Sequence, residues 1–281
     1  MDNKVNTSAY WEERYQSGRD SGSGSYGRLA EFKAEVINSF VNAHNISSVI
    51  EFGCGDGNQL SLMNYPAYVG LDVSPTVVSL CQNMFSANNA KSFCVYDENF
   101  SLYNKYDLAL SLDVIYHLVE NDVFEKYMQD LFEATDRFVC IYSSDEDSAV
   151  MSGYVKHRKV TAYIAANFPA WKLARHIPGR YPFNIDDANN TSFCDFFFYA
   201  KRNLDITWGE EFVPPQPGYD EAVSLLNENK KNLLITQFRA LEARAKMHEA
   251  NAKFHQVAAE NQELIERVKS LSKGVLICPK K

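Results

Sequence analysis

Residues 49–60 read Val-Ile-Glu-Phe-Gly-Cys-Gly-Asp-Gly-Asn-Gln-Leu, and this stretch decides the fold. Its apolar start is typical of a buried strand, its glycines are typical of a tight turn, and a helix is expected after Gly57. A second apolar strand ends in Asp72, 17 residues beyond Gly55. Strand, glycine turn, helix, strand and acid is the arrangement that binds a nucleoside in a doubly wound sheet. The sequence therefore predicts an α/β fold of that kind.

The spacing of the glycines and acids indicates which nucleoside ligands fit. A dinucleotide site uses G-x-G-x-x-G and places a pyrophosphate on a helix N-terminus, whereas the spacing here is G-x-G-x-G. Glu51, two residues before Gly53, would repel a phosphate and suits a cationic ligand. Glycine at 53 and 55 lets the backbone pass close under a ligand, where a Cβ would collide. Asp72 can accept hydrogen bonds from both hydroxyls of a ribose.

These residues carry a family resemblance. Glu51-Phe52-Gly53-Cys54-Gly55-Asp56-Gly57 resembles motif I of the class I S-adenosylmethionine-dependent methyltransferases, and Gly70-Leu71-Asp72-Val73-Ser74 resembles the ribose-binding motif that follows it. The alternative is a glycine-rich turn in some other α/β protein. The resemblance implies S-adenosyl-L-methionine as the cofactor. The cofactor-binding residues then include Glu51, Gly53, Cys54, Gly55, Asp72, Val73 and Leu112, with Asp97 as the acid that contacts the adenine. A solvated loop acid is the alternative for Asp97.

Strand and helix patterns alternate along residues 29–203. Strands are expected at 48–53, 67–72, 92–96, 106–112, 137–143, 171–177 and 194–201, and helices at 29–44, 57–63, 75–87, 121–133 and 157–167. Alternation with helices implies a parallel sheet. No helix separates the last two strands, so the last strand can be antiparallel. The sequence thus predicts a Rossmann-like, doubly wound, seven-stranded and mostly parallel sheet, which is the methyltransferase sheet that the resemblance implies.

Candidate catalytic residues follow the fourth and fifth strands, because ligands lie beyond the carboxyl ends of parallel strands. Ser111-Leu112-Asp113-Val114-Ile115-Tyr116-His117-Leu118 resembles the family's motif IV, which flanks the methyl group. His117 suits a general base at neutral pH. It could instead lie on a half-buried helix face with a carbonyl as its partner. His157 is a second candidate, although a solvated helix entry is the alternative for it.

The N-terminal segment, residues 1–28, is predicted to be a lid. Tyr10-Trp11-Glu12-Glu13-Arg14-Tyr15 resembles the aromatic lid of small-molecule methyltransferases, and aromatic faces attract a sulfonium as they attract other cations. The Gly/Ser run at 21–25 suits a hinge. The alternative is a helix that its aromatic residues pin to the sheet.

Composition narrows the class of protein. The 281 residues carry a net charge of −8 without a basic cluster, which disfavours a nucleic-acid partner. The six cysteines are scattered and form no C-x-x-C pair, so reduced thiols are expected. The start of the chain has no apolar core of a signal peptide, and no stretch is long enough to span a membrane, so a cytoplasmic location is expected. The acids at 145–147 and 186–187 raise the alternative of a metal-assisted reaction, but runs of surface acids are more often only solvated, and no metal site is predicted.

The C-terminal part has a different pattern. Residues 204–218 form a proline-rich linker, and residues 219–273 are predicted to form a long coiled-coil helix with an apolar seam from Met247 to Leu271. Such a stripe favours a homo-oligomer, and folding back on the first domain is the alternative. A methyltransferase joined to a coiled coil resembles the enzymes of bacterial surface-polysaccharide synthesis.

The main functional hypothesis is a methyltransferase that acts on an oxygen of a small molecule, sugar or glycan. A sulfonium is already activated, so alignment supplies much of the rate, but a hydroxyl acceptor also needs a base, and His117 could provide it. One rival hypothesis is a non-catalytic coiled-coil scaffold with a vestigial nucleoside pocket. The other is a different S-adenosylmethionine-using enzyme on the same fold, such as an aminopropyl transferase or a hydrolase of the cofactor.

Overall fold

The computed structural model of this chain describes residues 6–97, 100–147, 154–204 and 247. The predicted linker and coiled coil lie outside the described residues, apart from Leu204 and Met247. The helices are α1 (Thr7–Gln16), η1 (Ser23–Ser25), α2 (Gly27–Ala43), α3 (Asn58–Ser61), α4 (Pro75–Met84), η2 (Ile115–His117), α5 (Asn121–Glu133), α6 (Val160–Asn167) and η3 (Ile185–Asn190). The strands are β1 (Val49–Phe52), β2 (Tyr68–Asp72), β3 (Lys91–Val95), β4 (Tyr106–Leu112), β5 (Thr135–Ser143), β6 (Trp171–Ile177) and β7 (Asp195–Lys201).

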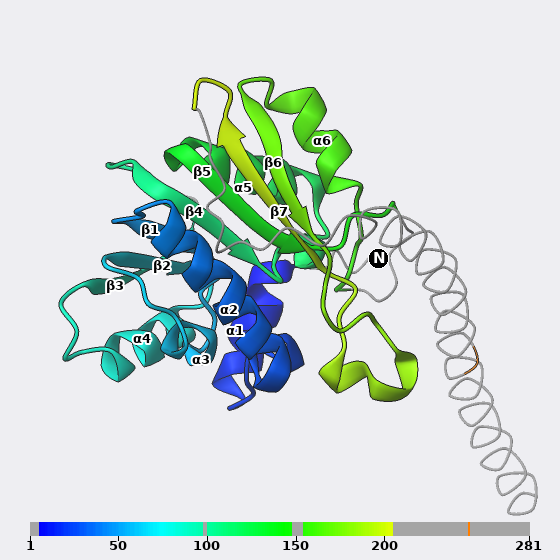
Figure 1. Cartoon of the computed structure of the whole chain (residues 1–281). Coiled ribbons are helices and arrows are strands. Elements are labelled where there is room, and N and C mark those ends of the chain that lie inside the picture. The colour runs from blue at the N-terminus through cyan, green and yellow to red at the C-terminus, as the bar shows by residue number, and fades with distance from the viewer. Residues whose placement is uncertain (1–5, 98–99, 148–153, 205–246, 248–281) are drawn as a thin grey trace, which may run out of the picture. The chain divides into compact units, whose positions relative to one another are not determined.

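The strands form one seven-stranded sheet in the order β3-β2-β1-β4-β5-β7-β6 (Figure 1). β1 to β5 pair in parallel, whereas β7 runs antiparallel to both β5 and β6. The predicted mostly parallel sheet with an antiparallel last strand is therefore confirmed. The order reverses between β1 and β4, and a ligand site is expected beyond the carboxyl ends of these two strands.

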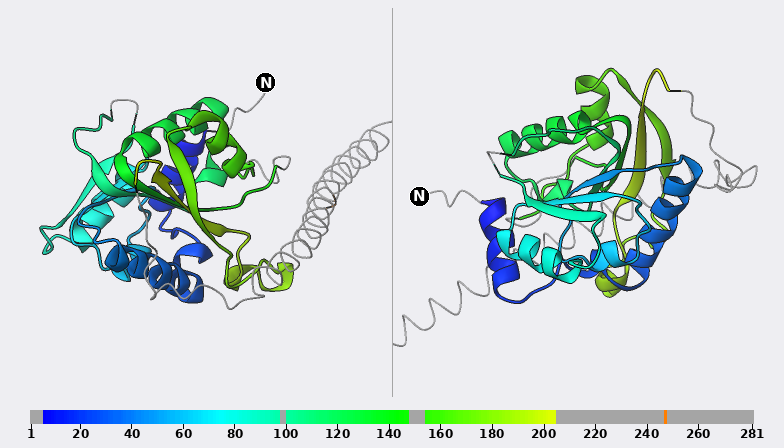
Figure 2. Two further views of the ribbon diagram at one scale, coloured as in Figure 1. Left: turned by 45° about the horizontal axis from the view of Figure 1, so that its top comes forward. Right: turned by 90° about the vertical axis from the view of Figure 1, so that its left-hand side faces the viewer.

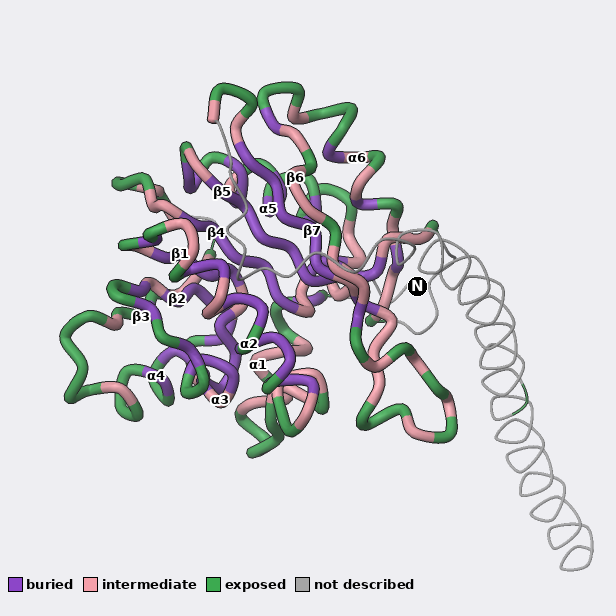
Figure 3. Tube along the Cα trace, viewed as in Figure 1, coloured by how far each residue is buried: buried purple, intermediate pink, exposed green. Residues whose placement is uncertain are grey.

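Helices cover both faces of the sheet, as the views in Figure 2 show for α2 and α5. On one face, Phe40 of α2 and Val78 of α4 belong to a core cluster with Phe138 and Phe198 of the sheet. On the other face, Met128 of α5 and Ile164 of α6 pack with alternate residues of the same strands. The central strands are buried along nearly their whole length, and the outer strands β3 and β6 are partly exposed (Figure 3). The near-continuous apolar runs of the central strands reflect this two-sided burial.

The helix boundaries differ from the predicted ones near the site. The helix expected to start at His157 begins at Val160, so His157 lies in the connection after β5. The residues after β4 form only one 3₁₀ turn, η2. α3 is a single turn that follows Gly57 at φ 81°. Side chains fix these short connections, and apolar periodicity does not reveal them.

No helix among the described residues is long and apolar enough to cross a membrane.

Candidate active site

A cavity lies at the carboxyl ends of β1, β2 and β4 and is lined in part by α1. Most of the predicted site residues line it, namely Trp11, Glu51, Gly53, Cys54, Gly55, Asp72, Val73, Leu112, Asp113 and His117. Tyr10, Asp97 and His157 are not among its lining residues. The topology therefore brings together residues that are up to about a hundred positions apart in the chain.

The glycine turn after β1 is tightly enclosed. Gly53 and Gly55 have φ angles of 85° and 59°, which other residues rarely adopt. A Cβ on Gly53 would lie 2.4 Å from Cγ2 of Val114, and one on Gly55 would lie 2.5 Å from Oγ of Ser21. A side chain at either position would therefore collide with the segment after β4 or the segment after α1, even without a ligand beside the turn.

Asp72 is buried at the end of β2 and is held by backbone donors. Its carboxylate accepts hydrogen bonds from the backbone N–H of Gly55 at 3.0 Å and of Ser74 at 3.1 Å. Burial raises the pKa of Asp72 to about 6, against the opposing effect of these donors. The acid is therefore fixed beside the glycine turn, where it can accept hydrogen bonds from a ligand.

Glu51 is buried under the same turn. It accepts a 2.6 Å hydrogen bond from the hydroxyl of Tyr68. Burial raises the pKa of Glu51 to about 7, although the hydrogen bond and the nearby charge of Lys33 act in the opposite direction. A cation in the cavity would stabilise the charged form of Glu51, which agrees with the sequence argument for a cationic ligand.

Helix α1 is anchored to the two sides of the cavity. The Thr7 hydroxyl donates to Oε2 of Glu120 at 2.6 Å and lies 3.1 Å from the carbonyl oxygen of His117. On the other side, Glu12 accepts hydrogen bonds from the hydroxyls of Ser74 and Thr76 at the start of α4. Both anchors fix α1 as a cover over the strand ends.

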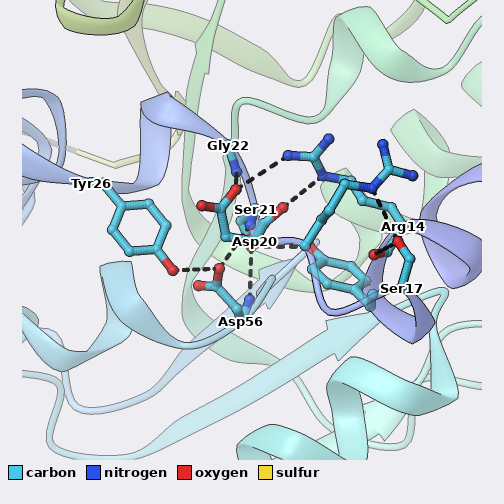
Figure 4. Close-up of polar contacts among 9 residues, drawn as sticks. Arg14, Ser17, Asp20, Ser21, Gly22, Tyr26 and Asp56 are labelled. Carbon is cyan, nitrogen blue, oxygen red and sulfur yellow. Dashed lines mark hydrogen bonds and ion pairs between the residues drawn. The ribbon is translucent and has the colours of Figure 1, made fainter.

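The loop that follows α1 is held against the glycine turn by Asp56 (Figure 4). The carboxylate of Asp56 accepts from the backbone N–H of Ser21 at 2.7 Å and from the hydroxyl of Tyr26 at 2.9 Å. The backbone N–H of Asp56 donates to the Ser21 hydroxyl at 2.8 Å. The Gly/Ser run that was predicted to be a hinge is therefore docked, in this structure, on motif I itself.

The predicted lid aromatics take different positions. Trp11 lines the cavity and meets the ring of His117 edge-on at 5.1 Å. Tyr10 stacks on Tyr154 with a ring separation of 4.1 Å. Tyr15, which is not among the predicted site residues, also lines the cavity, and its hydroxyl oxygen lies 3.0 Å from the hydroxyl oxygen of Ser21.

His117 is held in one tautomer. Its Nδ1 lies 3.1 Å from the carbonyl oxygen of Tyr154, which can only accept, so Nδ1 carries the proton. Burial lowers the pKa of His117. A neutral imidazole with a protonated Nδ1 has an unprotonated Nε2, and this is the form that a general base requires.

His157 has different surroundings. It is buried and does not line the cavity, and its Nδ1 lies 2.7 Å from the Ser144 hydroxyl with its ring against Tyr116 and Phe193. Burial lowers the pKa of His157 to about 4. Its place outside the cavity lining favours a positioning role for it over direct contact with a ligand.

Asp113 combines an unusual backbone with a buried ion pair. Its φ of 60° is rare for a residue other than glycine. Its Oδ2 lies 2.6 Å from Nζ of Lys33, which is 1% exposed, and its Oδ1 accepts from the Tyr116 hydroxyl at 3.1 Å. Sequence reasoning missed Lys33, although a signal exists. Lys33 falls on the apolar stripe of the helix, four residues after Leu29 and four before Ile37.

The end of β3 differs from the expectation. Asp97 is exposed, whereas its neighbour Tyr96 lines the cavity and donates a hydrogen bond to Asp130. The contact of Asp97 with an adenine stays a prediction.

Among the described residues, no group of three or more His, Cys, Asp or Glu side chains could hold a metal ion.

The fold resembles those of known methyltransferases. The N-methyltransferase NodS of Bradyrhizobium japonicum, in complex with S-adenosyl-L-homocysteine, superimposes with a TM-score of 0.56 and 15% identity, over 71% of this chain and all of that one. The magnesium protoporphyrin IX methyltransferase ChlM of Synechocystis, with bound S-adenosylmethionine, gives 0.52 and 14%, over 72% and 100%. No protein-family model and no curated protein matches the sequence. This chain therefore has the class I methyltransferase fold.

The raised pKa of Glu51 predicts a pH-dependent stability. Between the ordinary pKa of 4.5 and the folded value of about 7, the folded state binds more protons than the unfolded chain, so the free energy of unfolding falls as pH rises. A difference of this size corresponds to about 3 kcal/mol. Glu51→Gln should be more stable than the wild type at pH 8 and of similar stability at pH 4.5. Urea unfolding across this pH range measures it.

The matched control is Glu31→Gln, which changes an exposed acid on α2. Its stability curve should follow that of the wild type. Parallel curves for the wild type and Glu51→Gln would refute the assigned ionisation of Glu51.

Proposed function

We propose that this chain is an S-adenosylmethionine-dependent methyltransferase that methylates an oxygen of a small molecule, sugar or glycan. The observation that carries the proposal is the buried carboxylate of Asp72, held by the backbone N–H of Gly55 inside a cavity at the switch point of a methyltransferase sheet. The fold alone is shared by enzymes with many acceptors, so the acceptor class rests on the residues of the site.

The lining of the cavity fits the cofactor. The glycine turn keeps side chains out of its floor, and Asp72 can accept from the ribose hydroxyls. Apolar surface for the adenine ring comes from Tyr96, Val73 and Leu112. Glu51 and the face of Trp11 suit the positive charge of a sulfonium. The acidic side chains that line the cavity are therefore suited to the ribose diol and to the positively charged groups of S-adenosylmethionine.

When bound, the cofactor supplies a methyl group that its sulfonium has already activated. The residues of this chain then have to orient the acceptor, exclude water and remove one proton. α1, fixed through Thr7 and Glu12, covers the cavity and restricts access of water. His117 holds its proton on Nδ1, so its Nε2 can take the proton of an acceptor hydroxyl.

The presence of a general base, His117, favours a hydroxyl acceptor, because methylation of a carboxylate or phosphate oxygen would need no proton removal. The oriented His117 and the two buried acids argue against a vestigial pocket, since buried charged groups are costly without a function. A cytoplasmic role in surface-polysaccharide synthesis, and a homo-oligomer through residues 219–273, are parts of this proposal that rest on the sequence pattern.

The test is a methylation assay with S-adenosylmethionine and a panel of sugars, sugar phosphates and glycans. A methyltransferase releases S-adenosylhomocysteine only when an acceptor is present. Release without any acceptor would indicate a hydrolase of the cofactor, and binding without any turnover across the panel would support a scaffold.

Asp72→Ala should weaken the binding of S-adenosylmethionine by about 1.5–3 kcal/mol, because it removes hydrogen bonds to a charged group. Isothermal titration calorimetry measures the change. Asp186→Ala, at an exposed acid of η3, is the control and should bind like the wild type. Unchanged affinity in Asp72→Ala would sink the assignment of the ribose site.

His117→Ala should lower turnover by about 10²–10⁴-fold with little effect on cofactor affinity, because only proton removal is lost. The lowered pKa of His117 also predicts a wild-type rate that is level near pH 7 and falls only below pH 6.5. His176→Ala, whose ring lies on Phe197 of β7, is the control. Near-normal turnover in His117→Ala would transfer the role to His157 or to no residue.

A further inference from the structure

Arg158 binds the backbone that follows His117. Its Nη1 donates to the carbonyl oxygen of Leu118 at 2.6 Å, and its Nη2 donates to that of Val119 at 3.3 Å. Nη2 also donates to Oδ1 of Asn121, the first residue of α5, at 3.1 Å. One guanidinium therefore fixes the connection between η2 and α5.

Residues 154–158 also hold the backbone on the other side of His117. The backbone N–H of Lys156 donates to the carbonyl oxygen of Tyr116 at 2.8 Å, and the carbonyl oxygen of Tyr154 accepts the Nδ1 proton of His117. η2 is a single turn, and the last carbonyl groups of a helix need partners from outside it. This clamp segment, residues 154–158, thus binds the chain before and after the imidazole.

The chemistry of the contact requires an arginine. A guanidinium carries five N–H donors in a planar fork, so it can reach two successive carbonyl groups and an amide oxygen at once, whereas a lysine has its donors on one atom. Cζ of Arg158 lies 4.3 Å from the centre of the Phe124 ring, and burial lowers the pKa of Arg158. A neutral donor would close an ordinary turn without the cost of desolvating a charge. The charge therefore calls for a functional explanation.

The position of this backbone decides where the free ring nitrogen of His117 lies. Nδ1 is directed at Tyr154, so Nε2 is on the opposite edge of a ring that lines the cavity. A general base has to come within about 2.6–3.2 Å of the proton that it removes. A displacement of about 1 Å can lower a rate by about 10²-fold. The contacts of one 3₁₀ turn do not supply that precision, and the fork of Arg158 does.

Helix α1 completes the surroundings of the ring but does not replace the clamp segment. Trp11 meets the His117 ring edge-on at 5.1 Å, and Tyr10 stacks on Tyr154 at 4.1 Å. A ring contact does not select a tautomer, whereas a hydrogen bond from Nδ1 to a carbonyl oxygen does. That hydrogen bond lasts only while the clamp segment stays beside the turn, and Arg158 ties the two together.

We propose that Arg158 is a positioning residue, which binds the carbonyl groups of Leu118 and Val119 and so holds His117 with its Nε2 toward the acceptor. This inference rests on the proposed function. Arg158 is not among the lining residues of the cavity, so it acts through the backbone and does not touch a ligand.

The test is nitrogen-15 NMR of the full chain labelled at histidine. The two ring nitrogens of a histidine have separate resonances when one tautomer is fixed, and the resonances converge when the tautomers interchange. His117→Gln identifies the resonances of this ring. At neutral pH the wild type should show a protonated Nδ1 and an unprotonated Nε2, and Arg158→Met should show converged resonances.

The same variant separates positioning from cofactor binding. Arg158→Met should lower turnover in the methylation assay by about 10–100-fold, because the base is displaced but present. Its affinity for S-adenosylmethionine, measured by calorimetry, should equal that of the wild type. Arg158→Lys keeps the charge without the fork and should show a smaller convergence, so it serves as the test if Arg158→Met does not fold.

Arg137→Met is the matched control. Arg137 also donates to a carbonyl oxygen, that of His44 at 3.1 Å, and also lies over an aromatic ring, that of Phe138. It is remote from the cavity lining, so its loss should leave the His117 resonances and turnover unchanged. Thermal melting checks the fold of each variant. In Arg158→Ala, millimolar guanidinium chloride should restore the separate resonances, and methylammonium chloride at the same ionic strength should not.

The outcomes distinguish this inference from the proposed function. Unchanged His117 resonances in folded Arg158→Met would overturn the inference and leave the proposed function standing. Converged resonances with wild-type turnover would do the same, as would an equal fall of turnover and cofactor affinity, which indicates a merely structural residue. A wild type that methylates no acceptor, with the NMR result as expected, would refute the proposed function and the role of Arg158 in it.

Discussion

The burial of carboxylates at the carboxyl ends of β1 and β2 is the constraint on which the site depends. Glu51 and Asp72 lie on neighbouring strands, and their pKa values are raised to about 7 and about 6 because both are removed from water. Backbone N–H groups and the Tyr68 hydroxyl compensate only part of that cost. A cationic ligand with hydroxyl donors would supply the positive charge and the hydrogen bonds that these acids lack.

The second feature of the site is a cover whose hydrogen bonds end on the site itself. Glu12 reaches the first turn of α4, Thr7 reaches the end of η2, and Ser21 with Tyr26 reaches Asp56 of motif I. Each anchor contacts a predicted site residue or a residue next to one, namely His117, Ser74 beside Val73, and Asp56 beside Gly55. Displacement of the cover and changes in the cavity wall are therefore physically linked.

The sequence pattern was sufficient to predict the strands of the sheet. Each strand was predicted within about two residues of its observed limits, because apolar runs bounded by glycine, proline and polar residues are local signals. The antiparallel β7 followed from the missing helix before it. The helix limits were less predictable. Val160, and not His157, begins α6, since the contacts of His157 with Ser144 and Phe193 hold the preceding segment in an irregular path.

The sequence by itself determined the glycine turn, the acid at the end of β2 and the place of the cavity, because these depend on spacing within one strand-turn-helix unit. Only the tertiary structure decided which distant side chains meet. Lys33 and Asp113 are 80 residues apart, and no periodicity indicates that they form an ion pair. The same holds for His117, whose tautomer is set by the carbonyl of Tyr154. Such contacts arise from the packing of whole elements, and packing is a property of the folded chain and not of any local pattern.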